Sequence, residues 1–272
     1  MGLLQEFAFN ESDIITTDRF LNSTINIPQI IYIKTDFLYN QRKFIWRNKS
    51  HPDVKRFNSA HIAIVGHSDY AFIKEYAERF KRIKQWFVVN NHTTLPNVIS
   101  LPLGVTNDCD DSQRHRLFGN NTLIMNAIRR PKNPIHLVYM NFNLITYPSE
   151  RNYVYNMFAN KPWVKTGQHK DTKECRQAFL NDIYDSKFCI CPRGNGLDTH
   201  RLWETLYLKT FPIVIFHSHF ANMTDLPILF INSWDEVTEE FLIHKYEEMS
   251  NTEYNLDKLK VSYWISLFKS AI

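Results

Sequence analysis

The stretch SKFCICPRGNGLDTHRLWETLYLKTFPIVIF, residues 186–216, decides the fold. The apolar run 188–191 predicts a buried strand, which the following proline ends. The turn 193–196 contains two glycines, and Asp198 or Thr199 stands where a helix cap is expected. A second apolar run closes the stretch. The order is therefore strand, glycine-containing turn, helix and strand, as in α/β proteins.

A strand that turns into a helix in this way aims backbone N–H groups at whatever lies above the turn. Arg193 and Arg201 flank the same place, so the sequence predicts a site for a multiply charged anion such as a diphosphate. Glu204 follows Arg201 by three residues and shares its helix face, where it is placed to accept from sugar hydroxyls. The simpler alternatives are an ion pair within the helix and glycines that serve only the turn.

Within this stretch, residues 188–208, closed by Pro212-Ile-Val, resemble the donor-site signature of exostosin-like glycosyltransferases. Weaker likeness extends over residues 138–143, 148–151, 66–70 and 99–105. Within the family, the chain is similar to the short, anchorless chlorovirus xylosyltransferases that build capsid N-glycans. One departure is clear, because many relatives have a glycine after the helix and this chain has Lys209-Thr210-Phe211. That difference leaves the tightness of the turn into the next strand in question.

The resemblance implies a GT-B architecture, in which two Rossmann-like domains face each other across a cleft and a C-terminal helix returns to the N-terminal lobe. It also implies an inverting transfer from a UDP-sugar, with xylose favoured, to a hydroxyl of a glycan acceptor. The expected domains are an acceptor-side domain (1–130), a donor domain (131–252) and a returning helix (253–272). Such a scheme needs no metal and no cofactor beyond the nucleotide sugar.

The chain pattern agrees with an α/β arrangement. Residues 62–65 and 86–89 read as buried strands, with a helix expected over 70–83 between them. Residues 126–133 look like the crossing between the two halves, 135–140 starts a second set of strands, and 256–268 has helical apolar spacing.

An inverting displacement needs a base opposite the diphosphate. Asp69 is our first candidate, since it follows a strand whose carboxyl end should face the ligand, and His67 is the neighbouring alternative. Equally, Ser68 or Asp69 is a suitable cap for the following helix, and His67 alone is more often a packed residue. On the donor side we expect these residues to bind the nucleotide sugar: Arg193, Gly194, Asn195, Gly196, Asp198, Thr199, Arg201, Glu204, Asn141, Asn143 and Arg151.

Two rival functions remain open at this stage. Asp108-Cys109-Asp110 is the short acidic pattern with which metal-dependent glycosyltransferases hold manganese, although such a pattern also arises by chance in solvated loops. Alternatively, the many aromatic residues suit a sugar- or nucleotide-binding module without turnover.

The composition limits the classes of binding partner that the sequence predicts. A net charge of +4 without a basic block argues against nucleic acid and is compatible with a small anionic substrate. From the sequence we expect no leader, no anchor and no stretch that spans a bilayer. The four cysteines, scattered except for one Cys-x-Cys, favour a reducing compartment. The expected location is cytoplasmic, in a virus-infected host cell if the viral likeness holds.

Overall fold

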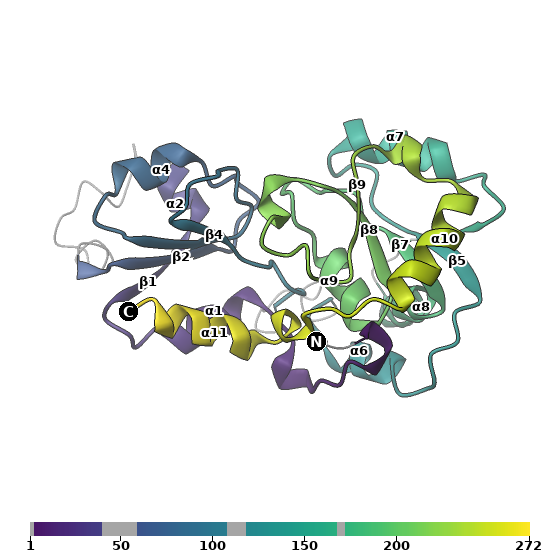
Figure 1. The fold of residues 1–272 in the computed structure, drawn as a ribbon, viewed down its shortest axis with the longest axis horizontal. Helices are drawn as coiled ribbons and strands as arrows, with labels where there is room; N and C mark the ends of the chain where they lie inside the picture. The colour runs from purple at the N-terminus through teal and green to yellow at the C-terminus, as the bar shows by residue number, and fades with distance from the viewer. Residues whose placement is uncertain (1–2, 40–58, 108–117, 168–171) are drawn as a thin grey trace.

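The computed structural model describes residues 3–39, 59–107, 118–167 and 172–272. It is an α/β protein with two parallel sheets, which Figure 1 shows side by side along the long axis. We call the part built on the first sheet the first lobe and the part built on the second sheet the second lobe.

The sheet of the first lobe has its described strands in chain order. They pair in parallel, and β2 is buried at every position because helices cover both faces. The strands are β1 (Ile30–Lys34), β2 (Ile62–Gly66), β3 (Gln85–Val88) and β4 (Val98–Ser100). The helices of this lobe are α1 (Thr17–Thr24), α2 (Thr35–Tyr39) and α4 (Lys74–Arg79).

The sheet of the second lobe is also parallel, but its order is β6-β5-β7-β8-β9. The chain first adds β6 on one side of β5 and then β7, β8 and β9 on the other, so the order reverses between β5 and β7. In open α/β sheets, ligands bind beyond the carboxyl ends of the strands at such a reversal. The strands are β5 (His136–Met140), β6 (Val164–Thr166), β7 (Ser186–Ile190), β8 (Phe211–Ile215) and β9 (Leu229–Ile231).

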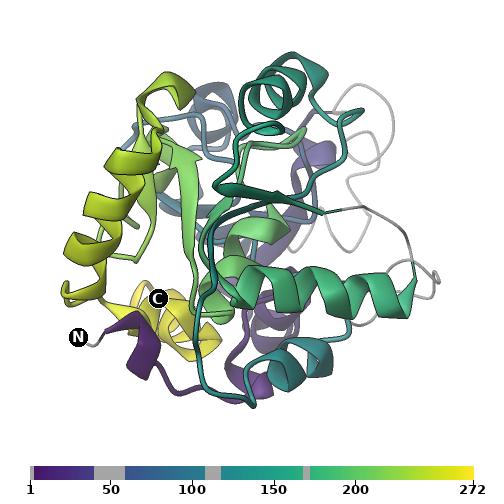
Figure 2. The ribbon, with the colours of Figure 1, turned by 90° about the vertical axis from the view of Figure 1, so that its right-hand side faces the viewer.

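Helices pack on both faces of this second sheet (Figures 1 and 2). They are α7 (Pro148–Phe158), α8 (Lys173–Tyr184), α9 (His200–Tyr207) and α10 (Glu239–Ser250). The helix α6 (Thr122–Ala127) packs against α8. The segment that packs with the second lobe therefore begins before residue 130. Short 3-10 helices span Leu4–Glu6, Glu11–Asp13, Ser218–Phe220, Trp234–Glu236 and Leu256–Leu259.

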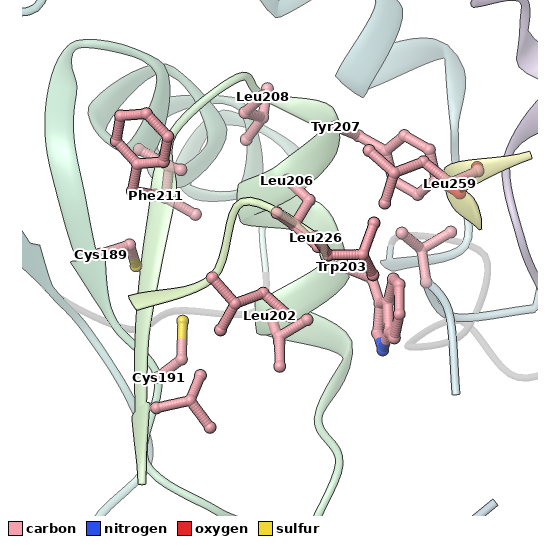
Figure 3. Close-up of a cluster of buried hydrophobic side chains, with 14 of the residues drawn as sticks. Cys189, Cys191, Leu202, Trp203, Leu206, Tyr207, Leu208, Phe211, Leu226 and Leu259 are labelled. Atoms are coloured by element: carbon pink, nitrogen blue, oxygen red, sulfur yellow. Dashed lines mark hydrogen bonds between the residues drawn. The ribbon is translucent and has the colours of Figure 1, made fainter. Parts of the chain in front are cut away.

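Helix α9 is the structural centre of the second lobe. All its residues from Leu202 to Tyr207 are buried. Figure 3 shows its apolar side chains between Leu259 on one side and Cys189 of β7 with the following Cys191 on the other. The Tyr207 hydroxyl accepts from the backbone N–H of Ile15 (2.8 Å) and donates to the carbonyl of Leu259 (2.7 Å). One side chain therefore ties α9 to segments near both ends of the chain.

The turn after α9 is as tight as a glycine would make it. Lys209 has a φ of 55°, in the left-handed region. Its N–H donates to the carbonyl of Leu206, and the N–H of Thr210 donates to the carbonyl of Thr205. These two bonds form a Schellman motif, which usually has glycine at the left-handed position. The lysine adopts the conformation at a cost of about 1–2 kcal/mol.

The final helix, α11 (Val261–Ser270), leaves the second lobe and packs on the first. The ring of Phe268 makes edge contacts with Phe20 of α1 (5.5 Å between centroids) and Phe87 of β3 (4.9 Å). In the part of the chain that the structure describes, no helix is both long and apolar enough to cross a bilayer.

The helix expected over 70–83 begins later than the sequence suggested, at Lys74. The reason is a short extension of the first sheet, in which Phe72 bridges to Asn91 and its N–H donates to the carbonyl of Asn90. Residues engaged in this bridge are extended and cannot join the helix. Neither Ser68 nor Asp69 caps α4, because its N-cap position is Ile73.

Candidate functional site

A cavity of about 1010 Å³ lies between the two lobes. Its first-lobe wall includes residues 67–70, directly after β2, and its second-lobe wall includes Asn141 and Asn143 after β5 and the loop 194–199 after β7. The cavity therefore lies at the carboxyl ends of the strands, where the order of the second sheet reverses. This position brings most of the predicted site residues together, although the groups around them differ from those expected.

The loop between β7 and α9 has little room beside its second glycine. A Cβ added to Gly196 would lie 2.5 Å from the Asn90 side chain, whereas one added to Gly194 would meet nothing closer than 3.4 Å. Asn90 itself holds the loop, since its Oδ1 accepts from the N–H of Asp198 and its Nδ2 donates to the carbonyl of Ser68. The glycine at 196 thus permits a close contact between the lobes.

We predicted that Asp198 contacts the donor, but its carboxylate is engaged in bonds within the protein. Its buried carboxylate accepts from the N–H of Leu103 across the lobe boundary (2.7 Å), the N–H of Thr199 (2.7 Å) and the indole N–H of Trp203 (2.8 Å). These bonds occupy its oxygens within the protein. Thr199 is the N-cap residue of α9 and lines the cavity, but its hydroxyl makes no capping bond to the helix.

Arg201 lines the cavity, and its guanidinium carbon lies 5.8 Å from the centroid of the Phe179 ring. Its Nε is buried and has no hydrogen-bond partner, and within the described residues its guanidinium forms no ion pair. Arg151, which also lines the cavity, is held by bonds from its Nε to the carbonyl of Arg193 and from its Nη1 to the carbonyl of Asn143 (2.9 Å each). Burial, and then the charge of Arg201, lower the pKa of Arg151 to about 10. Two neighbouring cations therefore polarise this wall.

Arg193 does not line the cavity, which corrects the prediction that it grips a ligand directly. Its Nε donates to the carbonyl of Gly194 (3.3 Å) and its Nη2 to that of Asn195 (2.9 Å). The guanidinium carbon lies 4.2 Å from the centroid of the Tyr147 ring. Arg193 shapes the loop, because its donors are turned back onto the loop's own carbonyls.

Glu204 lines the cavity, but its ion-pair partner is Arg176 of α8 and not Arg201. The Arg176 Nη2 lies 2.5 Å from Oε1, and both side chains are nearly fully buried. Burial alone would raise the pKa of Glu204, yet the Arg176 charge and hydrogen bond bring it below its ordinary value. Sequence reasoning missed Arg176. The signal was available, since Arg176 shares a helix face with Phe179, Leu180 and Ile183, where an unpaired charge is unfavourable.

The two asparagines after β5 also line the cavity and are held in place. The Nδ2 of Asn141 donates to the hydroxyl of Tyr139 (2.9 Å). The Oδ1 of Asn143 accepts from the N–H of Ile145 (2.9 Å), which forms a local turn. The side chains we expected to contact the donor thus have fixed positions at the cavity wall.

The opposite wall carries both candidate bases. His67 has a φ of 53°, and its Nε2 lies 2.7 Å from Oδ1 of Asp18 in the first turn of α1. Burial, opposed by the Asp18 charge, lowers the pKa of His67. Asp69 is exposed to the cavity, and its Oδ2 accepts from the Nδ2 of Asn195 in the second lobe (3.3 Å). Nothing in the sequence pointed to Asp18, whose contact with His67 depends on how α1 packs.

The acidic pattern Asp108-Cys109-Asp110 lies outside the described residues. No protein-family model matches the chain, and no curated protein matches it.

Proposed function

We propose that this protein is an inverting glycosyltransferase of the GT-B type, which transfers a sugar from a UDP-sugar, with xylose favoured, to a hydroxyl of a glycan. The observation that carries the proposal is Arg201, beside Arg151 at the reversal point of the second sheet. Its buried Nε has no hydrogen-bond partner, and its guanidinium forms no ion pair among the described residues. A half-buried cation in such a place requires an anion to neutralise it.

The size and polarity of the cavity support a nucleotide sugar. A volume of about 1010 Å³ is at the upper end of the range for small-molecule sites. The two arginines and the uncapped start of α9 favour a diphosphate, and Glu204 and the asparagines supply oxygens and amides for ribose or sugar hydroxyls.

The first-lobe wall of the cavity supplies the general base that the proposed reaction needs. In the proposed step the acceptor oxygen attacks the anomeric carbon from the face opposite the diphosphate, and the carbon–oxygen bond to the diphosphate breaks. The electron pair leaves with the diphosphate, whose charge Arg201 and Arg151 stabilise. The acceptor proton goes to Asp69, which is exposed to the cavity, whereas the Nε2 of His67 is engaged with Asp18.

The test is thermal stabilisation of the protein by UDP and by a panel of UDP-sugars. A ligand at about one hundred times its Kd should stabilise the fold by about 2.7 kcal/mol. Replacing Arg201 by Met should weaken binding about 10- to 100-fold, because a charge-assisted bond is lost. Arg193→Met should weaken it less, and Arg79→Met, on the exposed face of α4, should not change it.

Two results would contradict the proposal: no stabilisation by any nucleotide, or full stabilisation of Arg201→Met. Turnover that is lost in a chelator and restored by manganese would instead favour the metal-dependent mechanism of the Asp108-Cys109-Asp110 loop. Binding without any transfer or slow hydrolysis of the donor would favour a binding module.

A further inference from the structure

Two exposed tyrosines stack at the first-lobe edge of the cavity. The rings of Tyr39, at the end of α2, and Tyr70, which follows β2, have centroids 4.8 Å apart and planes inclined by 13°. Tyr70 lines the cavity, and 46% of it stays exposed although Tyr39 covers one ring face. Tyr39 is 61% exposed. Large aromatic rings left open beside a polar cavity are a feature that requires an explanation.

The same wall carries two carboxylates. Asp36, one helical turn before Tyr39, and Asp69, next to Tyr70, both line the cavity. Within the described residues neither one pairs with a cation. The cavity is thus polarised, with arginines on the second-lobe wall and, beside the aromatic rings of the first-lobe wall, carboxylates that have no cationic partner in the part of the chain that the structure describes.

From this arrangement we infer that the first-lobe edge is a subsite for an uncharged saccharide acceptor. The C–H face of a sugar ring would stack on Tyr70, with Tyr39 supporting that ring, and its hydroxyls would donate to Asp36 and Asp69. The carboxylates would repel a uronic or sialic acid at this place. The inference rests on the proposed function, because it assigns the acceptor of the same site.

The experiment uses the full chain, saturated with UDP, on an array of immobilised neutral oligosaccharides and their uronate- or sialate-bearing counterparts. We expect binding to neutral glycans in preference to acidic ones. Tyr70→Ala and Tyr39→Ala should weaken that binding about five- to tenfold, and Tyr70→Trp should retain it. Tyr155→Ala is the matched control, since this tyrosine is 40% exposed on α7 of the other lobe. Asp36→Asn should raise the binding of acidic glycans.

Thermal stabilisation by UDP, measured on the same variants, separates the two proposals and checks folding. If UDP does not stabilise the wild-type protein, the proposed function fails. If UDP stabilises every variant, the inference alone is overturned by any of three results: glycan binding that is indifferent to both tyrosines, preference for acidic glycans, or no glycan binding.

Discussion

At the scale of single residues, the difference between Arg193 and Arg201 shows what decides whether a charged side chain can bind a ligand. Both belong to the loop–helix block, and both were expected to hold an anion. Arg193 uses its donors on the carbonyls of its own loop, whereas the Nε of Arg201 has no hydrogen-bond partner and its guanidinium forms no ion pair among the described residues. Only the second is available to neutralise a bound diphosphate.

In the mechanism that we propose, replacing Asp69 by Asn should lower kcat by about 10²–10⁴-fold, because the isosteric amide cannot take the proton of the acceptor hydroxyl. Binding of UDP should persist, since the arginines lie on the other wall. Turnover with a UDP-sugar and thermal stabilisation by UDP measure the two effects separately. His67→Gln is the companion variant, and a larger loss of kcat there than in Asp69→Asn would transfer the role of base to His67.

At the scale of elements, helices α8 and α9 are joined by the buried pair of Arg176 and Glu204. A buried pair contributes little compared with apolar residues of similar size, but removal of one partner leaves an uncompensated charge. The pair therefore fixes how the two helices meet at the cavity wall.

Glu204→Gln should destabilise the protein by about 3–5 kcal/mol, because Arg176 is then buried without its counter-charge. The double variant Arg176→Met/Glu204→Leu should recover most of this loss, and urea denaturation measures both. Because the pKa of Glu204 lies below its ordinary 4.5 in the folded state, the stabilisation is present above about pH 4.5. It should be lost as the pH falls through the lowered value, and this acid-dependent component should be absent from the double variant.

The parts of the fold and site that could be predicted from sequence are those in which neighbours in the chain decide the outcome. The strands before the two candidate loops, the turn at 193–196 and the placement of Asp69 after a strand follow from local patterns. Asp18 enters the site from α1, whose packing no local pattern fixes. The apolar face of α8 marks Arg176 as buried, but it does not identify Glu204 as its partner. The predicted start of α4 was wrong because the bridge of Phe72 to Asn91 joins two segments that are distant in the chain, and no local pattern reveals such a contact.

At the scale of the whole molecule, the two lobes share apolar packing through the C-terminal helix. Phe268 is fully buried between α1 and β3 of the first lobe, although the segment before it leaves from the second. Together with the Tyr207 bonds to Ile15 and Leu259, this contact links the lobes on the side away from the labelled helices α4 and α7 (Figure 1).

Phe268→Ala should destabilise the protein by about 3–5 kcal/mol, since it removes a buried ring and leaves a cavity. The midpoint of urea unfolding should fall accordingly. Ile272→Ala, on a side chain that is 59% exposed in the same terminal segment, should change the free energy of unfolding by less than about 0.5 kcal/mol. Equal effects of the two variants would show that the helix adds no stability to the first lobe.

The place of Phe268 also has a consequence for synthesis of the chain. Phe20 and Phe87 are made early, but the ring that packs between them is made only after the strands of the second lobe. The first lobe must therefore leave the ribosome with an apolar gap, which closes only when α11 has followed it. During that interval the nascent first lobe exposes apolar surface, and its packing is completed after the second lobe is made, although it is translated before it.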